Sequence, residues 1–137
     1  MDCPFCDIDE TRTRIIADKK HVFVALSNPR LMDGHLLVIP RRHVQKLSEL
    51  NEFEKKELLD TVIEYQEKIL TFAGGCDIRQ NYRPFQAQSN VKIHHLHMHL
   101  QPRELHDELY QKCQIFETGI FKELSQEEIE KIKKAMG

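Results

Sequence analysis

The stretch IHHLHMHLQP, residues 93–102, places four histidines within six positions. Side chains on a β-strand alternate between its two faces, so in an extended chain His95, His97 and His99 share one face. The apolar residues between these three, together with His94, share the other face. A strand with a purely structural role does not need three imidazoles in a row, so the pattern indicates a functional site.

Three interpretations of this row compete. Chance surface histidines on an edge strand are the simplest. A metal site made by all three is the second, but same-face side chains lie about 6–7 Å apart along a strand and do not converge easily on one ion. The third is a row of imidazoles with separate roles along an extended substrate. Neutral imidazole, with an ordinary pKa of about 6.5, is a nucleophile that can form a covalent intermediate with a phosphoryl or acyl centre.

The chain around this stretch predicts further strands. Residues 21–27 and 35–40 are apolar on both faces, and the segment between them contains Pro29 and the turn-forming pair Asp33-Gly34, so the two runs predict an antiparallel hairpin. The remaining strands are predicted at residues 12–18, 76–82 and 91–100.

Two helices complete the prediction. Residues 51–73 repeat apolar side chains every three or four positions, with Asn51 as N-cap, Glu54 in the reciprocal capping position and a glycine pair at the end. A second helix is predicted at residues 126–136, opened by a capping box. The fold class is therefore α+β.

Composition limits the class of protein. The chain has 137 residues, 40% of them hydrophobic, and a net charge of −2. This length predicts a single domain, with a core at about residues 1–103 and an extension at 104–137. The charge argues against binding nucleic acid through bulk electrostatics. No apolar run is long enough for a transmembrane helix, and the acidic N-terminus does not resemble a secretory signal, so a cytoplasmic location away from membranes is expected.

The first residues contain a possible metal-binding pair. Cys3 and Cys6 form a C-x-x-C, which in a reducing compartment is typically metal-binding or redox-active. No thioredoxin-like pattern surrounds the pair. A closed tetrahedral zinc site would need two more ligands.

Three motifs together resemble the histidine triad (HIT) superfamily of nucleotide hydrolases and transferases. The signature of alternating histidine and apolar residues reads HLHMHLQ at 95–101, where Gln101 departs from the apolar pattern. The segment DGHLLVIPRRH, 33–43, resembles the family's hairpin, and CPFC, 3–6, resembles the start of many bacterial members.

The resemblance implies a mechanism. His97 would attack the α-phosphorus of a nucleotide and form a nucleotidyl-histidine intermediate, with His99 bonded to the phosphate and His95 as the third member of the catalytic triad. The substrate would be a nucleotide phosphoramidate, a dinucleoside polyphosphate or a related conjugate, cleaved by hydrolysis or nucleotidyl transfer. A catalytically weak module that binds purine nucleotides is the alternative.

The resemblance also suggests nucleotide contacts. The segment before the triad has no glycine and is longer than the family's phosphate loop, and Lys92 occupies the family's Ser/Thr position. The candidate nucleotide-binding residues are Ser27, Asn28, His35, Asn81, Gln88, Ser89 and Lys92.

Related members bind structural zinc, and the resemblance implies that His43 and His95 join Cys3 and Cys6, with His94 as a rival ligand. It also implies a five-stranded antiparallel sheet on the 51–73 helix and a homodimer that pairs through this helix. The alternative to the dimer is that residues 104–136 fold back and cover the helix within one chain.

Overall fold

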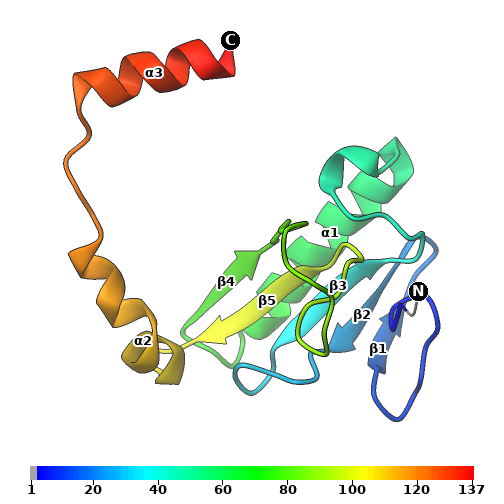
Figure 1. Ribbon diagram of the computed structural model, residues 1–137. Helices are drawn as coiled ribbons and strands as arrows, with labels where there is room; N and C mark the ends of the chain where they lie inside the picture. The colour runs from blue at the N-terminus through cyan, green and yellow to red at the C-terminus, as the bar shows by residue number, and fades with distance from the viewer. Residues whose placement is uncertain (1–2) are drawn as a thin grey trace.

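The computed structural model describes residues 3–137, and its elements follow each other as sheet, helix, sheet and a helical tail (Figure 1). The strands are β1 (Arg14–Asp18), β2 (Val22–Leu26), β3 (Leu36–Pro40), β4 (Gly75–Arg79) and β5 (Met98–Arg103). The helical segments are η1 (Leu47–Glu49), α1 (Glu52–Ile69), α2 (Glu108–Lys112), η2 (Gln114–Gly119) and α3 (Gln126–Met136).

The strands form one antiparallel sheet in the order β1-β2-β3-β5-β4, which confirms the predicted five-stranded sheet. The predicted hairpin is also confirmed, because β2 pairs directly with β3. The central position of β3, next to β5, is what brings the hairpin motif and the histidine-rich stretch together (Figure 1).

The predicted strand at 91–100 is wrong in its start, because β5 begins only at Met98. Val38 pairs with Met98, so continuing this register by two residues would place Leu96 opposite Pro40. Proline has no N–H to donate to the ladder. The N–H of Leu96 instead donates to the carbonyl of Val44 at 2.7 Å. Of the three same-face histidines, only His99 therefore lies on a regular strand.

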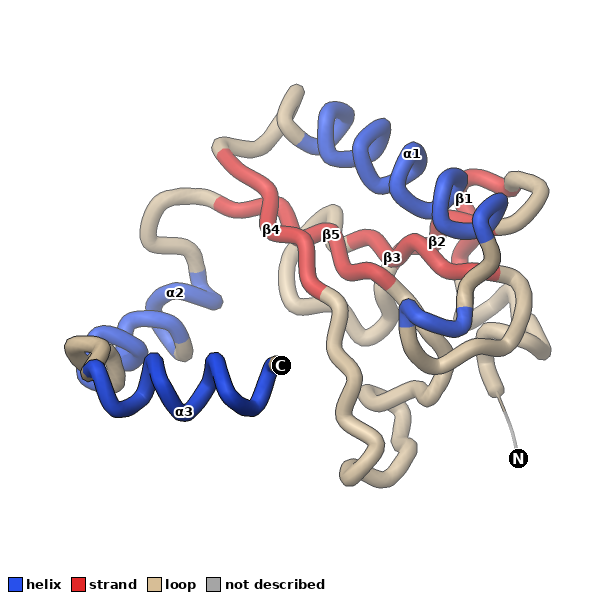
Figure 2. Tube along the Cα trace, turned by 90° about the horizontal axis from the view of Figure 1, so that it is seen from above, coloured by secondary structure: helices blue, strands red, loops and turns tan. Residues whose placement is uncertain are grey.

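The central strands β2 and β3 are buried on both faces of the sheet. On one face α1 covers a core formed by Val22, Val24, Leu36, Val38, Val44, Leu50, Leu58, Val62, Ile69, Leu96 and Leu100 (Figure 2). On the other face Phe5 and Ile8 of the N-terminal segment pack against a smaller cluster of Phe23, Ala25, Leu37 and Ile39. His99 pairs with Leu37 and so belongs to this second face, opposite α1.

The long helix starts as predicted and ends early. The side chain of Asn51 accepts a hydrogen bond from the N–H of Glu54, whose carboxylate accepts from the N–H of Asn51, so the capping box is confirmed. The helix ends at Ile69 rather than at 73, because the N–H groups of both Phe72 and Ala73 bond to the carbonyl of Ile69 and close a tight turn. β4 correspondingly occupies 75–79 instead of 76–82.

The tail extends away from the sheet (Figures 1 and 2). The predicted helix with its Ser125 and Glu128 capping box is present as α3, but among the described residues α3 packs against no other helix or strand. In this structure the tail therefore does not cover α1, and Phe53, Leu59 and Ile63 stay 73%, 60% and 51% exposed. Pairing of two chains through α1 remains a prediction. Within residues 3–137, no helix combines the length and the apolar character that crossing a membrane requires.

Candidate functional site

His97 and His95 are fixed by backbone carbonyls through different ring nitrogens. His97 Nδ1 lies 2.6 Å from the carbonyl oxygen of His95, so Nδ1–H is the donor and Nε2 keeps its lone pair. His95 Nε2 lies 2.7 Å from the carbonyl oxygen of Pro40, so here Nε2–H donates and Nδ1 keeps the lone pair. Two imidazoles two residues apart are thus held in opposite tautomers.

A second chain of hydrogen bonds orients His99. The N–H of Leu31 donates to His35 Nδ1 at 3.1 Å, so the ring proton of His35 is on Nε2. His35 Nε2 lies 2.9 Å from His99 Nδ1 and donates to it. His99 then carries its own proton on Nε2, which remains available as a donor. The His97 and His99 rings meet edge to face, with centroids 4.9 Å apart.

The site keeps these imidazoles neutral. Burial lowers the pKa of His35 to about 4, with smaller effects from the charges of His97 and Arg79. Burial also lowers the pKa of His99 to about 3, and neighbouring histidines and cations add to the shift. The pKa of His97 is lowered as well, mainly by burial. Neutral rings are the form in which one nitrogen donates and the other accepts.

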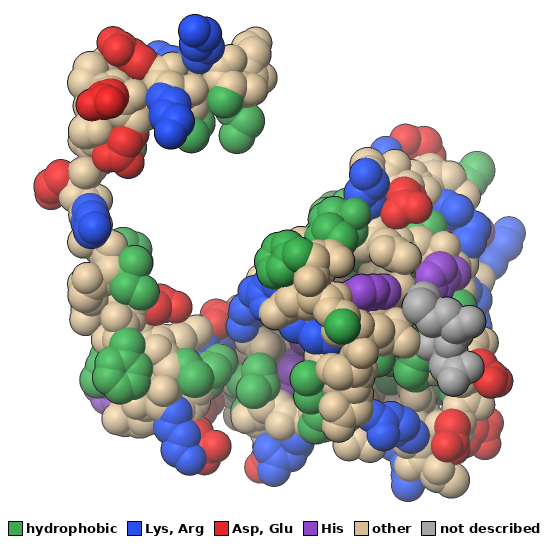
Figure 3. Space-filling model, in the orientation of Figure 1, with side chains coloured by type: hydrophobic (Ala, Val, Ile, Leu, Met, Phe, Trp, Pro, Cys, Tyr) green, Lys and Arg blue, Asp and Glu red, His purple; other side chains and the backbone are tan. Residues whose placement is uncertain are grey.

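A cleft of about 250 Å³ opens beside the triad, on the face where Figure 3 shows histidine side chains at the surface. Its lining is Phe5, Ser27, Asn28, Pro29, Arg30, Leu31, His35, Leu37, Asn90, Val91, Ile93, His97 and His99. The surface of this lining is mainly apolar although about half of its residues are polar, as in typical small-molecule sites. A smaller pocket of about 50 Å³ adjoins the cleft and shares Val91, Ile93, His97 and His99 with it.

The structure places most of the predicted nucleotide-binding residues at this site. Ser27, Asn28 and His35 line the cleft, and Asn81 and Lys92 line the smaller pocket. Gln88 and Ser89 line neither. The side-chain oxygen of Gln88 accepts from the N–H of His94, and Ser89 forms a turn with Lys92, so both shape the loop instead.

Several residues at the site were not predicted from the sequence. Arg83 lines the smaller pocket, and Asn90 and Val91 line the cleft. They belong to the irregular loop before the triad, whose course no periodic pattern predicts. Phe5 was also missed, although its place between Cys3 and Cys6 was a usable signal. Its ring lies edge-on to His95 and His97, with centroids 5.8 Å and 5.4 Å away.

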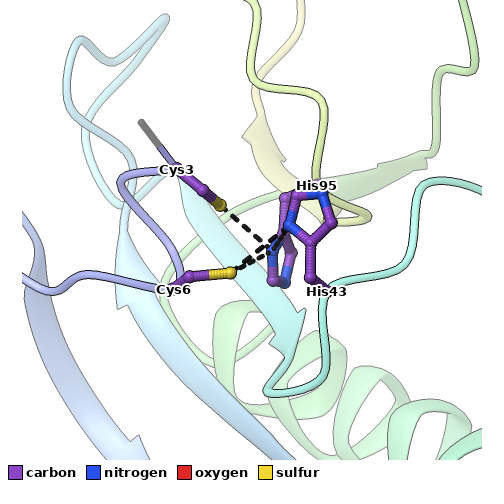
Figure 4. Close-up of side chains that lie close together, drawn as sticks. All are labelled: Cys3, Cys6, His43 and His95. Carbon is purple, nitrogen blue, oxygen red and sulfur yellow. Dashed lines mark hydrogen bonds between the residues drawn. The ribbon is translucent and has the colours of Figure 1, made fainter. Parts of the chain in front are cut away.

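The predicted metal ligands come together. The ligand atoms of Cys3, Cys6, His43 and His95 all lie within 4.8 Å of one another (Figure 4). His95 Nδ1 is 3.3 Å from Cys3 Sγ, 3.5 Å from Cys6 Sγ and 3.1 Å from His43 Nδ1. His94 is not part of the group: its Nε2–H donates to the carbonyl of Gln86 at 2.7 Å.

Local structure explains the convergence of these ligands. The N–H of Cys6 bonds to the carbonyl of Cys3, so a turn points both thiols the same way. Arg42, next to His43, is anchored by two hydrogen bonds to the buried carboxylate of Glu54. Burial, with Cys3 as second cause, raises the pKa of Cys6 to about 11, which a bound cation would oppose. Two thiolates and two imidazole nitrogens are a donor set typical of structural zinc, so the group could hold a metal ion.

Comparison with known proteins agrees with this geometry. The HIT domain model matches residues 9–106. An uncharacterized HIT-like protein of Methanocaldococcus jannaschii is 30% identical over 106 residues, which cover 74% of this chain and 78% of that protein.

Solved structures share the fold. A HIT family protein from Bacillus anthracis has a TM-score of 0.70 at 21% identity and covers 98% of this chain and 94% of its own. A zinc-bound histidine triad family protein from Mycobacterium smegmatis has a TM-score of 0.59 at 25% identity, with 80% of each chain covered. The three motifs, the sheet topology and the family match lead to one conclusion: this chain belongs to the HIT, or histidine triad, family.

Proposed function

We propose that the protein is a nucleotidyl hydrolase or transferase that works through a covalent intermediate on His97. The observation that carries this proposal is His97, which lines both the cleft and the smaller pocket and whose Nε2 keeps a lone pair because Nδ1–H donates to a carbonyl. The carbonyl of His95 fixes the tautomer, so the nucleophilic nitrogen needs no deprotonation before it attacks. Family membership supports the same chemistry.

The reaction has two steps. The Nε2 lone pair forms an N–P bond to the α-phosphorus, and the bond from phosphorus to the leaving atom breaks, with its electron pair departing on that atom. Water, or another acceptor, then attacks phosphorus and breaks the N–P bond. A nucleoside monophosphate leaves, the water proton passes to solvent, and Nε2 regains its lone pair.

The neighbouring residues would position the nucleotide. His99, with Nε2–H as donor, would bond an oxygen of the reacting phosphate and stabilise the charge that develops there. His35 would act through His99, as a positioning residue. Phe5, Leu37 and Ile93 supply an apolar lining suited to a nucleobase. Ser27 and Asn28, at the end of β2, would lie near the ribose.

We also propose that the metal is zinc, held by Cys3, Cys6, His43 and His95. With four protein ligands it would have no open position for water, so its contribution would be to stability. It would join the N-terminal segment to the ends of β3 and β5 (Figure 4). His95 would thereby act as a ligand and, through its carbonyl, as the group that sets the His97 tautomer.

The test is to trap the intermediate. The protein is mixed with a panel of nucleotide phosphoramidates and dinucleoside polyphosphates, then quenched in alkaline denaturant because N–P bonds are acid-labile. Peptide mass spectrometry should find a nucleoside monophosphate on His97, and none on the His97→Ala variant. Nucleotide binding without an adduct or turnover on any substrate would instead support the alternative of a binding module.

A further inference from the structure

Two cations line the smaller pocket beside His97, and a third lies near them. Arg83 and Lys92 line it, together with Asn81, His94 and the two reactive-site histidines. Arg79, the last residue of β4, pairs with His99 across the sheet, so its side chain starts from the same face. The charges of Arg79 and Arg83 both contribute to lowering the pKa of Lys92, after burial, which agrees with their closeness.

These three cations are not neutralised within residues 3–137, where no carboxylate makes an ion pair with any of them. The other end of the same strand pair is different. There Arg103 contacts Asp77 at 2.5 Å and Asp107 at 2.6 Å. Uncompensated like charges repel one another, and a cluster of them is stabilised when an anion binds.

We propose that Arg79, Arg83 and Lys92 form a subsite for an anionic leaving group, so that the preferred substrates are nucleotides whose α-phosphate carries further phosphate. This inference rests on the proposed function. The nucleoside would occupy the larger cleft, which adjoins the smaller pocket and shares His97 and His99 with it. With the nucleoside in the cleft, a group attached to the α-phosphate at His97 would extend into the smaller pocket, toward the cations.

The chemistry of the leaving atom also favours a leaving group that contains phosphate. When a phosphoanhydride is cleaved, the P–O bond breaks and its electron pair stays on the bridging oxygen of a phosphate, which departs as an anion without needing a proton. Fixed cations stabilise that developing charge. An amine must instead take up a proton as the P–N bond breaks, and a cationic pocket opposes a protonated amine.

The composition of the loop agrees with side-chain recognition of an anion. The loop that carries Arg83 and Lys92 has no glycine between residues 81 and 94. A glycine-rich loop offers backbone N–H groups to phosphate. Here the charged side chains of Arg83 and Lys92 supply the anion-binding groups instead.

The test compares two substrates in one set of variants. kcat/KM is measured for a dinucleoside tetraphosphate and for a nucleoside phosphoramidate with an uncharged amine substituent. The wild type is compared with Arg83→Gln/Lys92→Gln and with Lys20→Gln, an exposed lysine in the β1–β2 turn, as matched control. The double variant should lose about 100-fold on the tetraphosphate, because each charged contact contributes roughly tenfold or more. It should change less than about threefold on the phosphoramidate.

Equal losses on both substrates would overturn the proposal, because the cations would then serve the shared α-phosphate or the fold. No loss on either substrate, or a wild type that prefers the phosphoramidate, would also overturn it. In the last case the His97 adduct still forms, so the proposed function survives while the subsite does not. Absence of any adduct in the wild type would mean that the proposed function itself has failed.

Discussion

His95 and His97 are chemically identical side chains two residues apart, and the structure uses them in opposite ways. His95 is 1% exposed and presents Nδ1, the nitrogen nearer its own backbone, to the other three members of the candidate metal group. His97 lines the cleft and keeps the lone pair on Nε2, at the far end of its ring. In each case a backbone carbonyl accepts a hydrogen bond from the N–H at the other ring nitrogen.

The role of each of these imidazoles therefore depends on which of its ring nitrogens donates a hydrogen bond to a carbonyl. A ligand that presents Nδ1 stays close to the backbone and suits a buried, closed site. A nucleophile that presents Nε2 reaches further and suits an open cleft. The His95 carbonyl connects the two, because the residue that supplies the metal ligand also orients its neighbour.

The strongest way to break the comparison is to remove the reactive ring. His97→Ala should lower turnover by at least about 1,000-fold, because it removes a covalent step rather than one hydrogen bond. The free energy of unfolding should fall by only about 1 kcal/mol, the net value of one hydrogen bond. Steady-state kinetics and thermal unfolding measure the two effects. Near-normal kcat would show that His97 is not the nucleophile.

Removing the proposed metal ligands should mainly lower stability, whereas removing His97 should mainly lower turnover. Cys3→Ser/Cys6→Ser should lose the bound metal and at least about 3 kcal/mol of stability, because ligation free energy adds to folding. Elemental analysis should find about one zinc per wild-type chain and none in this variant. Cys113→Ser, which changes an exposed cysteine outside the cluster, is the control and should keep both metal and melting temperature. Wild-type protein that contains no zinc, although never treated with chelator, would contradict the zinc assignment.

The smallest effect tests the tautomer of His99. His35→Phe removes the donor to His99 Nδ1 and should lower kcat about 10- to 100-fold with little change in KM, because the ring that binds the phosphate loses its fixed proton position. His35→Gln can both accept from Leu31 and donate to His99, so it should stay within a few-fold of wild type. Ring ¹⁵N chemical shifts of His99 should report a changed tautomer only in His35→Phe.

A loss of activity in His35→Phe without any change in those shifts would mean that His35 acts through packing alone. Equal losses in both variants would show that the position needs an imidazole for another reason.

Periodicity and capping were enough to predict the hairpin, the long helix and α3. They could not predict that β5 starts at Met98, because that boundary depends on Pro40 standing opposite Leu96 in a register known only from the fold. The four metal-binding residues were within reach of motif resemblance. The tautomer of His95 was not, since it depends on the carbonyl of Pro40, which only the tertiary structure brings close.

The smaller pocket beside His97 could likewise be predicted only in part from the sequence. Lys92 could be recognised as a departure from the motif, but Arg79 and Arg83 join it only after β4 and the following loop fold beside β5. The sequence also predicted the helix α3 but not where it lies relative to the sheet. An amphipathic pattern shows which face of a helix is apolar, but it does not show which element that face packs against.

Phe5 would link the proposed metal group and the cleft thermodynamically. It stands between Cys3 and Cys6 in the chain and also lines the cleft beside His97. A bound metal would restrict this segment, so a nucleotide that uses the ring would have less disorder to remove. Linkage is reciprocal: the factor by which metal tightens nucleotide binding is the factor by which nucleotide tightens metal retention. The chelator concentration that removes half of the metal at equilibrium would therefore rise with occupancy of a cleft that the chelator never enters.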